Sequence, residues 1–144
     1  MEIKYQKLSN LAKEPSRGSA AAAGYDLYAA TDSVFTIPAH SSVMIPTDLS
    51  MELPDGYFGA IFARSGLASK KGLRPANCVG VIDSDYRGNI KVCLHNDTDE
   101  NKELDPGDRI AQLVLMPYIE MNFIESEQLE ETGRGDGGFG STGK

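Results

Sequence analysis

The chain has 144 residues, enough for one domain with a buried core and too few for two. Its formal net charge of −7 at pH 7 argues against binding to DNA or RNA that is independent of base sequence, because such binding needs a basic surface that displaces counterions. We therefore expect no direct nucleic-acid partner.

The N-terminal residues MEIKYQKL interrupt their apolar side chains with charge, unlike a signal peptide. No apolar run approaches the roughly 20 residues that span a bilayer. The two cysteines, Cys78 and Cys93, form neither a disulfide framework nor a zinc pattern, and we interpret them as small buried hydrophobes. These features predict a soluble protein without a membrane partner, located in the cytoplasm or elsewhere inside the cell and not secreted.

Short runs in which apolar residues alternate with a period of two predict half-buried β-strands. In chain order these runs are Ile3/Tyr5, Leu49/Met51/Leu53, Phe58/Ala60/Phe62, Ile90/Val92/Leu94 and Ile110/Gln112/Val114. Turn-forming residues separate them, as at 53–56, 86–89 and 105–108. One or two helical turns are expected over 65–71, ending at Gly72. The pattern predicts an all-β protein, either an antiparallel sandwich or a barrel.

Two polar residues interrupt otherwise apolar strands. Asp26 lies in the run at 23–27, and Gln112 lies in the run at 109–114. Each has two interpretations: a structural one, as a capped strand end or a satisfied core amide, and a functional one, as a ligand-binding group.

Groups suited to phosphate occur near the expected helix. Arg64, Ser65 and Gly66 follow a strand and offer a guanidinium, a hydroxyl and flexible backbone. This combination is suited to an anionic oxygen, although the tripeptide alone is a weak signal.

The segment 77–88 is an apolar strand that ends in carboxylates, an aromatic residue and a turn, and we interpret it as a hairpin with a polar tip. One interpretation is an acidic, solvated turn. In the other, the Asp83 carboxylate at the strand end orients and deprotonates a water molecule, and Tyr86 forms one wall of a pocket.

The C-terminal residues ETGRGDGGFGSTGK are rich in glycine and have little apolar surface to bury. They are either a frayed tail or a segment that folds over a ligand, and the single aromatic residue Phe139 favours the second interpretation. Arg134, Ser141 and Thr142 add a cation and two hydroxyls, and the glycine N–H groups are able to form an anion-binding nest.

Taken together, five stretches resemble, in order and spacing, the motifs of the trimeric dUTP pyrophosphatases (dUTPases). They are AGYDLYAA (23–30), RSGLA (64–68), NCVGVIDSDYRG (77–88), GDRIAQLV (107–114) and RGDGGFGSTG (134–143). The resemblance spans the chain from about Ile3 to its end. One departure is Ala63, where the family usually has proline, which we expect to loosen the turn that presents Arg64.

The resemblance implies hydrolysis of dUTP to dUMP and pyrophosphate, which limits uracil incorporation into DNA and supplies dUMP for dTMP synthesis. It makes Asp83 the general base for water that attacks the α-phosphorus, and it packs Tyr86 against the deoxyribose so that a 2′-hydroxyl has no room. The uracil edge would be bonded by Asn77 and by the hairpin backbone through Lys91, including Gly80, Val81 and Ile82.

The resemblance also implies which residues bind the triphosphate. The phosphate chain of the substrate would be held by Arg64, Ser65, Gly66 and Gln112, and its γ-phosphate would be contacted by Arg134, Ser141 and Thr142. Phe139, beside Gly140, would stack over the uracil. Mg²⁺ would be the cofactor, held chiefly by the phosphates, with Asp26 reaching it through coordinated water.

The family fold is a jelly-roll-like β-barrel that assembles as a homotrimer, and each active site draws on all three chains. We accordingly divide the chain into a barrel domain, 1–132, and a flexible glycine-rich arm, 133–144, that closes over an active site.

Two alternatives remain. A dCTP deaminase shares the fold, but deamination needs further acid–base groups for which the chain has no matching motif. A nucleotide-binding regulator or structural trimer would keep the fold without turnover, and the intact Asp83 argues against it.

Overall fold

The computed structural model describes residues 1–138, in which the regular secondary structure is a set of strands and one short helix. The elements are β1 (Lys4–Lys7), β2 (Tyr25–Tyr28), β3 (Phe35–Ile37), β4 (Ser42–Pro46), β5 (Leu49–Glu52), β6 (Tyr57–Phe62), α1 (Ser65–Lys71), β7 (Leu73–Pro75), β8 (Gly80–Ile82), β9 (Lys91–Asn96), β10 (Lys102–Leu104) and β11 (Arg109–Pro117). The expected all-β class is confirmed.

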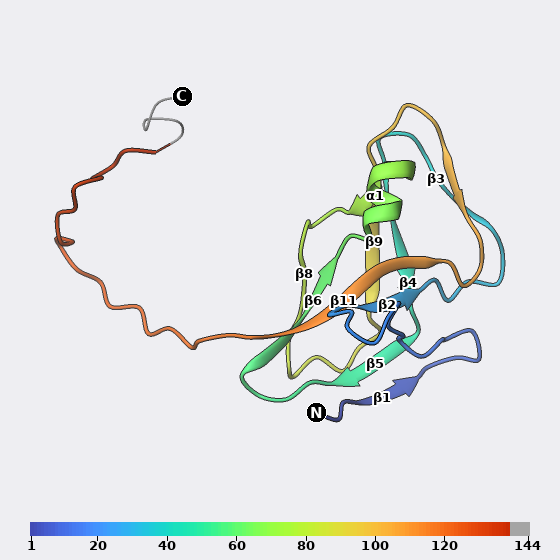
Figure 1. Cartoon of the computed structure of the whole chain (residues 1–144), viewed down its shortest axis with the longest axis horizontal. Coiled ribbons are helices and arrows are strands. Elements are labelled where there is room, and N and C mark those ends of the chain that lie inside the picture. The colour runs from blue at the N-terminus through green and yellow to red at the C-terminus, as the bar shows by residue number, and fades with distance from the viewer. Residues whose placement is uncertain (139–144) are drawn as a thin grey trace.

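The strands pair antiparallel in two main sheets (Figure 1). One sheet has the order β2-β11-β6-β8 and the other has the order β4-β9-β7, while β1 pairs with β5 and β10 pairs with β3. Most neighbours within a sheet are distant in sequence, so long connections cross between the sheets. The arrangement is the jelly-roll-like barrel expected from the sequence.

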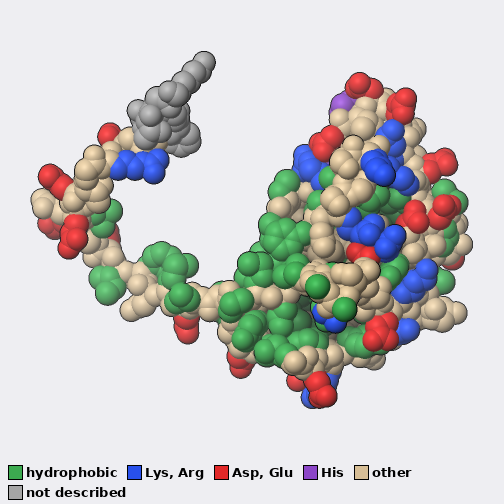
Figure 2. Space-filling view, in the orientation of Figure 1, with side chains coloured by type: hydrophobic (Ala, Val, Ile, Leu, Met, Phe, Trp, Pro, Cys, Tyr) green, Lys and Arg blue, Asp and Glu red, His purple; other side chains and the backbone are tan. Residues whose placement is uncertain are grey.

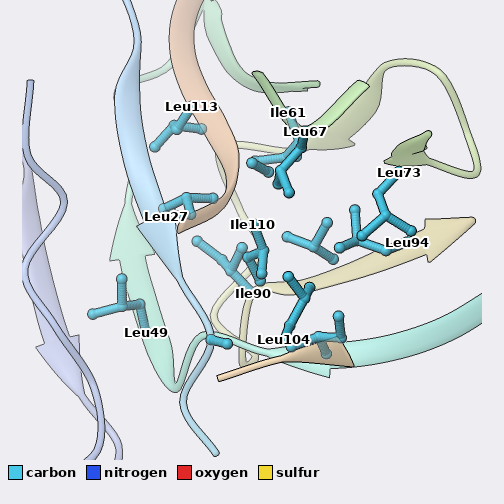
Figure 3. Close-up of a cluster of buried hydrophobic side chains, with 14 of the residues drawn as sticks. Leu27, Leu49, Ile61, Leu67, Leu73, Ile90, Leu94, Leu104, Ile110 and Leu113 are labelled. Atoms are coloured by element: carbon cyan, nitrogen blue, oxygen red, sulfur yellow. The ribbon is translucent and has the colours of Figure 1, made fainter. Parts of the chain in front are cut away.

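A single hydrophobic core lies between the sheets (Figure 3). Leu27 of β2 and Ile110 of β11 come from the first sheet, and Leu94 of β9 comes from the second; all three side chains are fully buried. The alternating apolar runs predicted Leu94 and Ile110 as inward-facing, because successive side chains of a strand point to opposite faces, but they did not include Leu27.

The helix α1 begins after Arg64 and ends at Gly72, as predicted. Gly72 adopts the left-handed conformation, with φ of 65°, and its N–H donates to the carbonyl of Leu67. Glycine adopts this conformation without the steric cost that other residues have. Since Leu67 is the buried side chain of α1, it anchors the short helix to the core.

The prediction of a hairpin over the segment that carries Asp83 is wrong. In the described chain β8 pairs with β6, and β9 is the middle strand of the other sheet, between β4 and β7. Because both edges of β9 already have partners, β8 and β9 diverge into different sheets. The connection 83–90 therefore crosses from one sheet to the other.

The chain leaves the sheets after Pro117. Residues 118–138 form neither helix nor strand and extend away from the body (Figure 1). Their apolar side chains are exposed, and Figure 2 shows them along the extension; Ile119, Phe123 and Leu129 are all more than 80% exposed. The division into a domain of 1–132 and an arm of 133–144 stays a prediction.

Across residues 1–138, no helix has the length and apolar character needed to cross a membrane.

Candidate functional site

A cavity of about 360 Å³ lies where β8 and β9 diverge. Such a volume is within the usual range for small-molecule sites, roughly 300–1,000 Å³. The cavity brings together seven of the residues predicted from the sequence: Asn77, Gly80, Val81, Ile82, Asp83, Tyr86 and Lys91. An amide, a carboxylate, a phenol and an ammonium group therefore border one cavity whose lining is both polar and apolar.

Five further residues line the cavity and were missed by the sequence analysis: Met44, Ile61, Asn89, Val92 and Cys93. Strand register explains two of them, since Met44 stands opposite Cys93 and Ile61 stands opposite Gly80. Pairing across strands is not visible in the alternation of one strand, so the sequence contained no signal for them. Cys93 is in the cavity wall and is only partly buried, and Cys78 is exposed, so the interpretation of the cysteines as buried is wrong for Cys78.

Gly80 allows β8 to approach β6 closely. A Cβ at this position would lie 3.0 Å from the Cβ of Ile61 and 3.3 Å from the amide nitrogen of Asn77. Any side chain at residue 80 would therefore press on the strand behind it and on the Asn77 amide inside the cavity.

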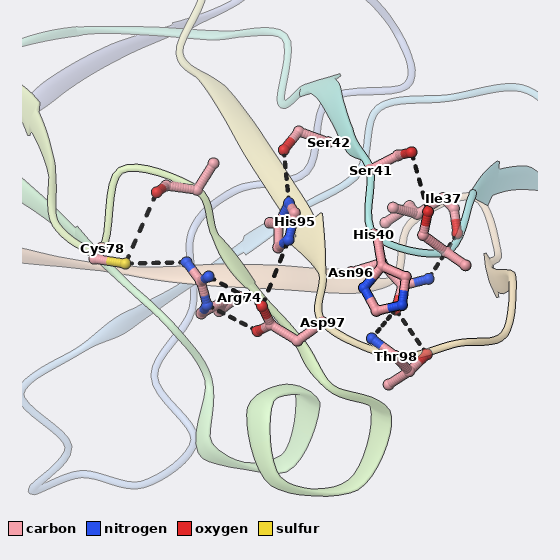
Figure 4. A network of polar contacts seen from close by, with 12 residues as sticks. Ile37, His40, Ser41, Ser42, Arg74, Cys78, His95, Asn96, Asp97 and Thr98 are labelled. Carbon is pink, nitrogen blue, oxygen red and sulfur yellow. Dashed lines mark hydrogen bonds and ion pairs between the residues drawn. The ribbon is translucent and has the colours of Figure 1, made fainter.

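The turn that carries Asn77 is held by a polar network (Figure 4). Arg74 donates two hydrogen bonds to the Asp97 carboxylate and a third to the Cys78 thiol, at 3.1 Å. His95 lies beside Asp97 and shares a hydrogen bond with Ser42. The hydrogen bonds to Asp97 raise the pKa of the Arg74 guanidinium. The network ties the turn to β7 and β9.

Asp83 follows directly after β8 and is exposed at the cavity. Within residues 1–138, no hydrogen bond or ion pair engages its carboxylate, and both oxygens are able to accept from water. The backbone turns immediately afterwards, with the N–H of Tyr86 donating to the carbonyl of Asp83 at 3.2 Å. This turn places the Tyr86 ring in the same cavity.

A second cluster of predicted residues is centred on Asp26. The Asp26 side chain is 10% exposed, and its carboxylate pairs with Arg64, 2.7 Å from Nε to Oδ1, and with Arg109, 3.3 Å from Nη1 to Oδ2. Gln112 stands opposite Asp26 across β11 and β2. Ser65 and Gly66 are exposed in the first turn of α1, directly after Arg64.

Arg109 was not predicted. In an unbroken strand Arg109 and Gln112, three residues apart, would face opposite sides of the sheet. The register of β11 shifts between Arg109 and Ala111, and this bulge places both residues on the face of the sheet that carries Asp26. The same bulge leaves the neighbouring residues Ile110 and Ala111 both buried. This pair of consecutive apolar residues, in a strand that otherwise alternates, was the only sign of the bulge in the sequence.

The segment before Arg64 is fixed by a hydrogen bond rather than by proline. Gln112 Nε2 donates to the carbonyl of Ala63 at 2.8 Å. A side chain at Gly24 would collide with the Gln112 carboxamide, so glycine there leaves room for it. This contact restrains the turn that Ala63 was expected to loosen.

The two groups of residues are separate within one chain. In the β6–β8 register Ile82 stands opposite Gly59, and Arg64 lies five residues further along the chain. At the rise of an extended strand this corresponds to roughly 16 Å. The backbones of Asp83 and Arg64 are therefore well separated within one chain, and the Arg64 guanidinium pairs with Asp26.

Of the predicted tail residues, the structure places Arg134, whose Nε donates to the carbonyl of Gly137 at 2.7 Å. The remaining four predicted residues, Phe139, Gly140, Ser141 and Thr142, lie outside the described residues.

Fold and site together define a small all-β protein with a cavity bordered by a carboxylate and a tyrosine, and with a separate cluster of guanidinium groups. A profile of the family described as dUTPase matches residues 10–143. The deoxyuridine 5'-triphosphate nucleotidohydrolase of Desulfitobacterium hafniense is 51% identical over 144 residues, covering 99% of this chain and 95% of that protein. The chain belongs to the dUTPase family.

Other relatives agree with this assignment. The deoxyuridine 5'-triphosphate nucleotidohydrolase of Arabidopsis thaliana is 49% identical over 141 residues, which cover 98% of this chain and 82% of that protein. Among solved structures, the dUTPase of Staphylococcus bacteriophage 80alpha with dUpNHpp superposes with a TM-score of 0.89 at 29% identity, covering 99% of both chains. A dUTPase of phage phi11 of S. aureus, described with a structural Mg(II) ion, has a TM-score of 0.81 at 25% identity, covering 91% of this chain and all of that one.

Proposed function

We propose that this chain hydrolyses dUTP to dUMP and pyrophosphate, with Asp83 as the general base, in sites that a homotrimer shares among its chains. The cavity between β8 and β9 carries the proposal, because it gathers Asp83, Tyr86, Asn77 and Lys91 around one hollow. In a cell this reaction limits uracil incorporation into DNA and supplies dUMP for dTMP synthesis.

The cavity suits a nucleoside. Asn77 offers a side-chain amide that both donates and accepts, as the uracil edge requires, and the backbone of Gly80, Val81 and Ile82 borders the same space. Cytosine presents the opposite order of donor and acceptor and would leave buried polar groups unpaired, which disfavours it strongly. Tyr86 borders the sugar and leaves no room for a 2′-hydroxyl.

Asp83 acts on water. Its carboxylate accepts a hydrogen bond from the water, orients it toward the α-phosphorus and takes its proton as the new P–O bond forms. The bond from the α-phosphorus to the bridging oxygen breaks, and pyrophosphate leaves with that oxygen. A positioned base of this kind contributes roughly 10²–10⁴ in rate.

The phosphate chain requires local positive charge, because the protein is acidic overall. We assign the binding of the phosphate chain to Arg64, Ser65, Gly66 and Gln112. Arg109 lies beside Arg64, since both pair with the Asp26 carboxylate. Arg134, Ser141 and Thr142 of the arm, together with Phe139 and Gly140, are assigned to the γ-phosphate and the base.

Mg²⁺ fits the donor set around Asp26. Within residues 1–138, no three His, Cys, Asp or Glu side chains converge as a metal cage. One buried carboxylate suits an ion that keeps several waters and takes most of its ligands from phosphate oxygens. When bound, Mg²⁺ would neutralise charge on the triphosphate.

Three observations support a homotrimer with shared sites. Asp83 lies at the cavity between β8 and β9, whereas Arg64 lies in the separate Asp26 cluster of the same chain. Met44 and Val81, which line the cavity, are 57% and 58% exposed, as expected of a wall that another chain completes. The extension 118–138 carries exposed apolar residues that a neighbouring subunit would cover.

Pyrophosphate release from dUTP, measured beside dCTP, dTTP and UTP, tests the function. We expect turnover of dUTP that is lost with EDTA and restored by Mg²⁺, and little turnover of the others. Ammonia release from dCTP would indicate a deaminase, and tight dUTP binding without turnover would indicate a regulator.

A further inference from the structure

The connection 83–90, which carries Asp83 and Tyr86, is fastened at its C-terminal end to the segment 47–49. The N–H of Thr47 and its hydroxyl both donate to the carbonyl of Ile90, at 3.0 and 2.7 Å, and the N–H of Ile90 donates to the carbonyl of Leu49 at 2.8 Å. Thr47 and Ile90 are fully buried. This end of the connection is therefore rigid compared with its exposed tip.

Asp48 and Asn89 form a reciprocal pair at this junction. The Asn89 amide nitrogen donates to Oδ1 of Asp48 at 2.6 Å, and the backbone N–H of Asp48 donates to Oδ1 of Asn89 at 3.1 Å. Ser9 donates to the other carboxylate oxygen of Asp48 at 2.6 Å. Asp48 adopts φ of 51°, an unusual conformation for a residue with a side chain, which these contacts stabilise.

The pair connects directly to Tyr86. The Tyr86 hydroxyl donates to the backbone carbonyl of Asn89 at 3.0 Å. A side chain at Gly88 would collide with the Tyr86 ring, so glycine allows the ring to lie back over the connection. Because Tyr86 is 43% exposed, this hydrogen bond is a main restraint on the outer end of its ring.

We propose that the Asp48–Asn89 pair is a positioning device that holds the Tyr86 ring and thereby sets the discrimination between deoxyribose and ribose nucleotides. This role rests on the proposed function. It adds Asp48 and Asn89 to the residues that determine selectivity for dUTP over UTP. Asp48 and Asn89 act through Tyr86 and are positioning residues.

The physical reason is that steric exclusion works only when the wall cannot move. A 2′-hydroxyl is small, and a ring that shifts by about an ångström would admit it. Loss of one ordinary hydrogen bond corresponds to a factor of up to about ten in an equilibrium. We expect a change of that size in the ratio of kcat/KM for dUTP to kcat/KM for UTP.

The test exchanges the partners of the pair. Asn89→Asp places a carboxylate against the Asp48 carboxylate, and repulsion should lower the dUTP-to-UTP ratio about tenfold. Adding Asp48→Asn restores a pair of one amide and one carboxylate, with the donating amide now at position 48. The double variant should recover most of the dUTP-to-UTP ratio of kcat/KM. Tyr86→Phe removes only the hydroxyl and should lower the ratio by a similar factor, with or without the exchange.

Ser50→Ala is the matched control. Ser50 donates to the carbonyl of Arg87 in the same connection and, within the described residues, forms no hydrogen bond with Asn89 or Tyr86. We expect this variant to lose stability while keeping the ratio.

Unchanged ratios in both Asn89→Asp and Tyr86→Phe would overturn the proposal while leaving dUTP hydrolysis in place. An equal loss of ratio in Ser50→Ala, or a double exchange that recovers folding and kcat without recovering the ratio, would also overturn it. If the unmodified chain hydrolysed neither nucleotide, the proposed function itself would fail, and this role with it.

Discussion

Nε of Arg64 lies 2.7 Å from Oδ1 of Asp26, although the two residues are 38 positions apart in the chain. The pair joins the turn before α1 to β2, and Asp26 is nearly buried. A carboxylate in this position serves two purposes: it neutralises the guanidinium in the isolated chain, and it lies where a triphosphate and its cation would bind.

Asp26→Asn should lower the free energy of unfolding by about 1–3 kcal/mol, because two guanidinium groups lose their anionic partner. The Arg109 side chain is 51% exposed, so water screens part of this effect. Urea denaturation measures it. Asp55→Asn, an exposed turn residue outside the ion pairs, is the control; an equal shift in both variants would contradict a specific contribution from Asp26.

Asp83→Asn keeps the shape of the side chain and removes its basicity. We expect kcat to fall by roughly 10²–10⁴ while the dissociation constant for a non-hydrolysable dUTP analogue stays within a few-fold. Asp85→Asn, two residues away and outside the cavity lining, should keep near-normal turnover. Near-normal kcat for Asp83→Asn would remove Asp83 from the role of base.

Tyr86→Ala removes the proposed wall against the sugar. The kcat/KM for UTP should rise relative to that for dUTP, because the 2′-hydroxyl gains room. Steady-state kinetics on both nucleotides give the ratio. If it is unchanged, discrimination resides elsewhere in the cavity.

Deletion of residues 133–144 should leave a folded trimer with little activity, since this segment has little apolar surface to support a core. Circular dichroism and native mass spectrometry check folding and assembly. Unfolding or aggregation of the truncated chain would show that the arm is structural.

Shared sites are tested by mixing two inactive chains. When Asp83→Asn chains and arm-deleted chains are co-expressed in equal amounts, roughly a quarter of sites receive an intact base and an intact arm from different chains. Activity should recover to about that fraction. No recovery, in samples shown to contain mixed trimers, would mean that base and arm come from the same chain.

The sequence predicted the parts of the fold whose signal is local. Alternation identified β5, β6, β9 and β11, and a glycine at residue 72 marked the end of α1. It did not identify β3, β7 or β10, which have three residues each, too few to establish a period, or β4, whose apolar residues at 43–45 are consecutive and do not alternate. The sequence also did not predict which strands pair, since β8 pairs with β6 and does not form a hairpin with β9.

The site follows the same rule. Residues close in sequence, such as Asp83 and Tyr86, were predicted as one site and lie together in the cavity. Met44 was missed because it enters through its position opposite Cys93 in the register. Arg109 was missed because a strand without irregularity would turn it away from Asp26.

The bulge in β11 resolves a conflict between stability and binding. A strictly alternating strand places Arg109 and Gln112 on opposite faces, so only one of them could share a face with Asp26. The register shift in β11 allows Ile110 and Ala111 to fill the core while Arg109 and Gln112 lie on the same side of the sheet. Removing a single residue here would therefore turn Arg109 to the face opposite Gln112 and separate it from Asp26, a loss that a substitution elsewhere in β11 would not cause.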